Sequence, residues 1–142
     1  MPNLHPLLIH FPIAFFTVGL LFDLLAVFRK NPRFENVGWW SQVSGSVGLA
    51  AAIVSGLLAK STVSIPVQAS ATFETHEQIA FLLAALAASL LLWRIASRML
   101  LPTKNKAVFL LLMAIMVVVM WIGAWYGGEL VYSFGTGVQP VN

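Results

Sequence analysis

Four long apolar runs, separated by short polar segments, dominate the chain. They lie at about residues 6–28, 38–59, 76–95 and 107–127. A helix that crosses the hydrocarbon core of a bilayer needs about 20 mostly apolar residues, and each run reaches that length. The connections between the runs are too short to hold a second domain. The pattern predicts an all-α fold: a single integral membrane four-helix bundle over residues 1–142, with the lipid bilayer as its surroundings.

The composition agrees with this pattern. Of the 142 residues, 59% are hydrophobic and 9% are charged, and the mean hydropathy is +0.87. That is more apolar surface than a core of this size can hide from water. Cysteine is absent, which excludes disulfides, thiolate metal sites, iron–sulfur clusters and covalent c-type haem.

The basic residues predict the orientation of the bundle. Six of them fall at one end of the predicted helices, with Arg94 nearby and only Lys60 at the other end: Arg29, Lys30, Arg33, Arg98, Lys104 and Lys106. Loops rich in Lys and Arg stay in the cytoplasm, so both termini are expected outside it. The net charge of +3 does not indicate a nucleic-acid partner, because the basic residues form no stripe. The first run is expected to be retained, since no basic residue precedes it and no A-x-A site follows.

Small residues recur at every fourth position in the second and third runs. The rows are Ser44, Gly48, Ala52 and Gly56, and then Ala80, Ala84 and Ala88. Such rows let helix backbones approach closely in a membrane, so these faces are expected to be helix contacts. The alternative is that small residues are simply common in membrane helices.

All three histidines fall at the end of the bundle opposite the basic loops. Polar groups are costly near lipid, so His5, His10 and His76 at one depth indicate a site. Pro12 withholds an amide from the carbonyl of Leu8, and the resulting bend is expected to aim His10 inward. His5 precedes Pro6, a suitable first helical residue, so His5 is expected at a frayed end with an exposed ring.

The sequence around His76 fits a capping box. Thr75 would be the N-cap and Gln78 the third helical residue, so that the helix begins at His76. Ala80 and Ala84 follow on the same face and leave room for a flat group beside the imidazole. Haem b is the flat group that histidine binds. The alternative is that His76 only caps the helix and packs at the interface.

Two carboxylates need an explanation. Asp23 lies inside the first run, where an unpaired charge would cost several kcal/mol, and Arg94 lies at similar depth. We predict a structural ion pair between them; a proton-relay role for Asp23 is the alternative. Glu129, near the histidine end, is either an acceptor that orients a histidine or a solvated residue.

Three segments resemble a bacterial membrane-protein family labelled domain of unknown function 2231. They are HPLLIHFPIA at residues 5–14, LFDLL around Asp23, and GGELVYSFGTGV at residues 127–138. The resemblance spans nearly the whole chain. It implies a four-helix protein with histidines grouped on one side, in some members joined to redox modules, and hence a b-type haem role. In a bacterial inner membrane, the positions of the basic residues then predict periplasmic termini.

At one position this sequence differs from the family's usual pattern. Phe134 stands where the family usually has a histidine, so a two-haem arrangement is not expected. We take His10 and His76 as the axial ligands of a single haem iron, with Tyr132 of the closing motif as a further cofactor contact. His5 is then a spare, a haem-propionate contact, or a second ligand in place of His10.

The leading hypothesis is a small b-type haem-binding membrane protein or electron-transfer subunit, with haem near the outer face between the first and third helices. One alternative is a cofactor-free accessory subunit of a larger membrane redox or photosynthetic complex, or a homo-oligomer. Another is a metal-binding protein that uses His5 and His10 with Glu77 or Glu129. A catalyst is not expected, because the sequence lacks a nucleophile motif, an H-E-x-x-H motif and a phosphate loop.

Overall fold

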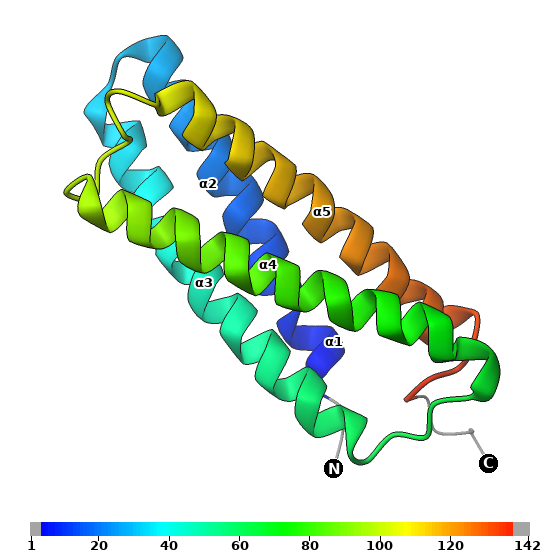
Figure 1. Cartoon of the computed structure of the whole chain (residues 1–142). Helices are drawn as coiled ribbons and strands as arrows, with labels where there is room; N and C mark the ends of the chain where they lie inside the picture. The colour runs from blue at the N-terminus through cyan, green and yellow to red at the C-terminus, as the bar shows by residue number, and fades with distance from the viewer. Residues whose placement is uncertain (1–3, 138–142) are drawn as a thin grey trace.

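A computed structural model describes residues 4–137, which form helices joined by short loops (Figure 1). The elements are α1 (His5–Leu8), α2 (His10–Arg29), α3 (Pro32–Lys60), the 3-10 turn η1 (Val67–Ala69), α4 (Ser70–Ala96) and α5 (Lys106–Tyr132). Within residues 4–137 there are no strands, and four stretches are long and apolar enough to cross a membrane: His5–Arg29, Pro32–Lys60, Val67–Ala96 and Lys106–Tyr132. The predicted all-α membrane bundle is confirmed.

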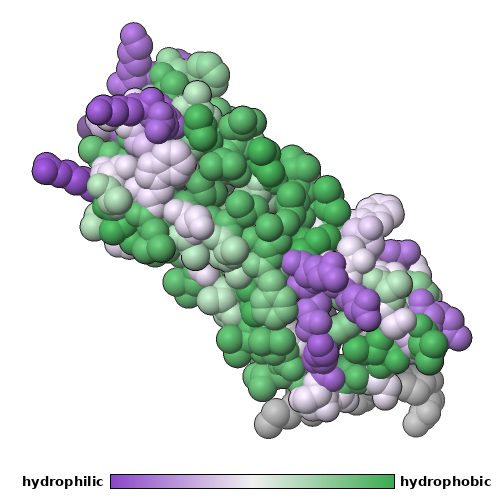
Figure 2. Space-filling model, viewed as in Figure 1, coloured by the Kyte–Doolittle hydropathy of each residue, from purple (hydrophilic) through white to green (hydrophobic). Residues whose placement is uncertain are grey.

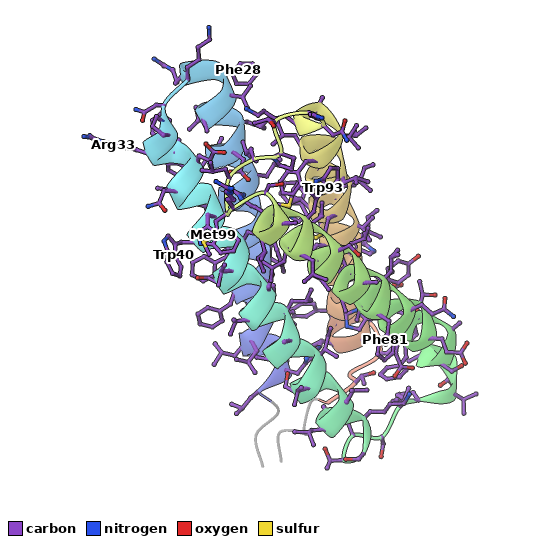
Figure 3. The ribbon with its side chains drawn as sticks, turned by 60° about the vertical axis from the view of Figure 1, so that its left-hand side comes forward. Phe28, Arg33, Trp40, Phe81, Trp93 and Met99 are labelled. Atoms are coloured by element: carbon purple, nitrogen blue, oxygen red, sulfur yellow. The ribbon has the colours of Figure 1, made fainter. Side chains whose placement is uncertain are left out.

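The four spans run up and down, so the bundle has two chemically different ends. The start of α1 and the end of α5 lie at the same end (Figure 1). We call this the histidine end, and the end with the α2–α3 turn and the α4–α5 loop the basic end. Figure 2 shows apolar surface over the middle of one face, with hydrophilic atoms toward the two ends. Phe28 and Arg33 mark the basic end in Figure 3, and Phe81 lies on α4 toward the histidine end.

A two-residue turn joins α2 to α3. Lys30 adopts a left-handed conformation, and the Asn31 side chain accepts a hydrogen bond from the Arg33 amide at 3.0 Å. Pro32 follows as the first helical residue, where its missing amide does no harm. The turn holds α2 and α3 as an antiparallel pair, and α3 begins six residues before the predicted position.

The first span is interrupted near its start. α1 ends at Leu8 and α2 begins at His10, because the ring nitrogen of Pro12 has no hydrogen to donate to the carbonyl of Leu8. The predicted bend is therefore present. It places His5 on α1 and His10 at the start of α2.

The predicted start of the third span is wrong. α4 begins at Ser70, and the Thr75 hydroxyl donates to the Ala71 carbonyl at 3.0 Å inside the helix, so Thr75 is not an N-cap. Residues 70–75 contain no Gly or Pro, and nothing in them stops the helix from extending back toward Pro66. His76 consequently lies about two turns inside α4.

The small-residue row of α3 is a helix contact, as predicted. A Cβ on Gly48 would lie 3.2 Å from Phe11 and Pro12 of α2, and a Cβ on Gly56 would lie 3.0 Å from His5 of α1. The row of α4 is different: Ala80 and Ala84 are half-buried and Ala88 is exposed. The buried face of α4 carries Leu83, Ala87 and Leu90 instead, because large side chains of α4 and α5 fill the core between them.

Candidate functional site

The histidine end brings two imidazole rings together. The ring centroids of His5 on α1 and His76 on α4 lie 6.2 Å apart, and the ring planes are inclined by 81°. His10 is exposed, and its ring makes no hydrogen bond with any residue from 4 to 137. The structure therefore pairs His76 with His5, and not with His10 as the sequence suggested.

The His5 ring is fixed to the backbone of α3. Its Nδ1 lies 2.8 Å from the carbonyl oxygen of Ala52 and 3.1 Å from the Ser55 hydroxyl. A carbonyl oxygen only accepts, so Nδ1 carries the hydrogen and Nε2 is the nitrogen with the lone pair in the neutral ring. His5 is thus half-buried and anchored, and the prediction of a frayed, exposed ring is wrong. The missing Cβ of Gly56 leaves the space that this ring occupies.

The His76 ring is fixed in the same way to α5. Its Nδ1 lies 2.9 Å from the carbonyl oxygen of Gly123, so it too carries the hydrogen at Nδ1. A Cβ on Gly127, one turn further along α5, would lie 3.0 Å from Cε1 of His76. Both rings therefore contact a glycine of a neighbouring helix, and both have Nε2 as the nitrogen able to bind a metal.

A cavity of about 410 Å³ surrounds this pair, which is within the usual size range of small-molecule sites. It lies between α1, the start of α2, α3, α4 and α5, and its wall is mostly apolar. Residues of the wall include Ile53, Ala80, Leu83, Met120 and Ala124. Of the other predicted cofactor contacts, His10 and Tyr132 line the cavity at its exposed edge, whereas Ala84 is outside the lining.

Charged groups stand at the rim of the cavity. Lys60 Nζ lies 2.7 Å and 2.9 Å from the two carboxylate oxygens of Glu77. Glu129 is half-buried and outside the lining of the cavity, and its side chain makes no hydrogen bond or ion pair within residues 4–137. Across the same residues, no three His, Asp or Glu side chains gather as metal ligands. The ligand set of His5 and His10 with Glu77 or Glu129 is therefore not assembled in this structure.

The second polar cluster lies toward the basic end. Arg94 and Asp23 are fully buried and form a salt bridge, with Nη1–Oδ2 and Nη2–Oδ1 distances of 2.6 and 2.8 Å. Arg94 also donates to Gln42 Oε1 at 3.2 Å and to the Glu35 carbonyl at 2.9 Å. The ion pair predicted between Asp23 and Arg94 is therefore present. Gln42 was missed, although a lone amide inside an apolar run was a signal for it.

The sequence matches one protein family over nearly its whole length. Residues 1–140 match the family described as "Predicted membrane protein (DUF2231)". The chain belongs to this family. No curated protein and no solved structure matches it. The family description gives a membrane location and no activity.

In this member of the family, the opening and closing motifs meet at the histidine end. His5 of the opening motif contacts His76, and His76 contacts Gly127 of the closing motif. Phe134 is half-buried and lies two residues after the end of α5. Val138, the last residue of the closing motif, lies outside the described residues. The motifs are therefore parts of one site, not two separate features.

Proposed function

We propose that this protein binds one b-type haem, which His5 and His76 would hold, and serves as an electron-transfer subunit. The observation that carries the proposal is the pair of rings at 6.2 Å. Imidazoles of two different helices that line one cavity would be able to hold the iron of a haem lying there.

The residues of the chain prepare both ligand nitrogens. The carbonyls of Ala52 and Gly123 hold the hydrogens on Nδ1, which leaves Nε2 as the basic nitrogen and fixes the ring orientations. The wall of the cavity is mostly apolar, and Ala80 and Gly127 keep bulky side chains away from the rings. When bound, the haem would supply a one-electron ferric–ferrous couple, whose potential depends on this burial and hydrogen bonding.

The same proposal includes the orientation. Six basic residues lie at the basic end or in its loops, and Lys60 is the basic residue at the histidine end. By the positive-inside rule, the histidine end faces the periplasmic side of a bacterial inner membrane. The haem would then exchange electrons near the outer face of that membrane.

Optical spectra of the purified protein test the proposal. Protein made in haem-replete cells should show a Soret band, and split α and β bands after reduction. His5→Ala and His76→Ala should each remove these bands. His10→Ala is the matched control, because it removes an exposed imidazole of the same motif and should leave the spectrum intact.

Two results would contradict this assignment in different ways. Loss of the bands in His10→Ala but not in His5→Ala would restore the ligand pair expected from the sequence. Colourless wild-type protein would overturn the haem function itself. Copper, zinc or iron in stoichiometric amount would then favour a metal-binding protein, and stable co-purification with a larger complex would favour an accessory subunit.

A further inference from the structure

Lys60 stands at the rim of the cavity in a fixed position. It ends α3, lines the cavity, and pairs with Glu77, the residue next to His76. Its ammonium lies 5.3 Å from the centre of the Phe73 ring, within cation–π range. The Lys60 side chain is 46% exposed. Glu77 and Phe73 thus contact a cation that lies between the apolar site and the surface.

We propose that Lys60 binds a carboxylate of the molecule held in the cavity; this rests on the proposed haem function, in which the carboxylate is a propionate. Haem b is apolar except for two propionates, and a carboxylate leaving water needs a cation or hydrogen-bond donors. The other seven Lys and Arg residues lie at or near the basic end, so Lys60 is the cation within reach.

The contact with Glu77 leaves Lys60 able to do this. An ammonium group has three donors, and Glu77 contacts it from one side through both carboxylate oxygens. No other hydrogen bond of Lys60 is found within residues 4–137. Donors of the ammonium therefore remain for a second carboxylate.

Two haem compounds and two variants test the inference. Haem-depleted wild-type protein in detergent is titrated with protohaem and with its dimethyl ester, which lacks the propionate charges. Lys60→Met should weaken protohaem binding about tenfold or more, the effect of losing a charge-assisted hydrogen bond. It should leave binding of the ester unchanged.

Glu77→Gln is the matched control, because it breaks the same salt bridge but keeps the ammonium. It should not weaken protohaem binding. Equal losses in Lys60→Met and Glu77→Gln would mean that the salt bridge matters only as structure, and would overturn the inference. An unchanged protohaem affinity in Lys60→Met would overturn it as well, and would leave Lys60 as a contact for lipid phosphates. Wild-type protein that binds neither compound would instead overturn the haem function.

Discussion

Arg94 of α4 donates to both carboxylate oxygens of Asp23 of α2, at 2.6 and 2.8 Å, across 71 residues of sequence. The same guanidinium reaches the Glu35 carbonyl and, at 3.4 Å, the Met99 carbonyl of the α4–α5 loop. The Glu35 side chain in turn accepts a hydrogen bond from the Leu101 amide. One buried cation therefore joins three helices and a loop at the basic end.

Breaking this pair should destabilise the bundle strongly. Asp23→Asn leaves the Arg94 charge buried without a counter-ion, and removing one partner of a buried pair costs about 3–5 kcal/mol. Replacing both, in Asp23→Leu with Arg94→Met, should cost less than the sum of the single changes. The free energy of unfolding in mixed micelles measures this. As a control, Glu77→Gln removes an exposed ion pair and should cost about 1 kcal/mol or less. The prediction would be contradicted if the double variant lost as much stability as the two single variants together.

The close approach of Asp23 to α3 depends on Gly38. A Cβ at this position would overlap Oδ1 of Asp23, so Gly38→Ala must push the carboxylate away from Arg94. Overpacking a tight contact costs about 1–3 kcal/mol. In Gly128→Ala, by contrast, the nearest atom to the new Cβ is 3.9 Å away. Equal unfolding free energies for the two variants would argue against this account of Gly38.

Gly127 and Gly128 of α5 allow an effect on the His76 ring to be distinguished from an effect on the helix. Gly127→Ala places a Cβ 3.0 Å from His76 Cε1 and should tilt the ring, lowering haem content and shifting the Soret band. Gly128 also lines the cavity, but no atom would lie nearer than 3.9 Å to its new Cβ, so Gly128→Ala should lower the haem content less than Gly127→Ala. Helix content by circular dichroism should stay the same in both variants, since alanine favours a helix more than glycine does. A Gly127→Ala protein with a wild-type spectrum would show that the ring position is not critical.

The absence of cysteine makes the proposed orientation testable with single substitutions. Ser61→Cys lies in the exposed loop after α3 at the histidine end, and Thr103→Cys lies in the exposed loop before α5 at the basic end. A maleimide that cannot cross membranes should label Ser61→Cys in spheroplasts and Thr103→Cys only after lysis. The reverse labelling pattern would contradict the proposed orientation and place the histidine end in the cytoplasm.

The parts of this structure that local chemistry determines were predictable from sequence. The length of an apolar run sets a membrane span, and the cost of a charge in lipid identified Asp23 and Arg94 as partners. The start of α4 was not predictable from Thr75 and Gln78, because a capping box matches inside a helix as well as at its beginning. Nothing in the sequence of residues 70–74 signals that the helix has already begun before Thr75.

The choice between His5 and His10 was harder for a different reason. It depends on which imidazole meets the carbonyl of Ala52 and the open space at Gly56, and these belong to another helix. No spacing within residues 5–14 contains that information. The Pro12 bend was readable, but the direction in which it turns each ring was not.

The long separation between Asp23 and Arg94 also imposes an order on biogenesis. The carboxylate emerges from the ribosome and enters the bilayer 71 residues ahead of its guanidinium. Until the third span arrives, the first hairpin carries an uncompensated acid among acyl chains, which is a costly state. A nascent chain interrupted before residue 94 would therefore be a natural substrate for membrane quality control, whereas arrival of Arg94 completes the hairpin's insertion.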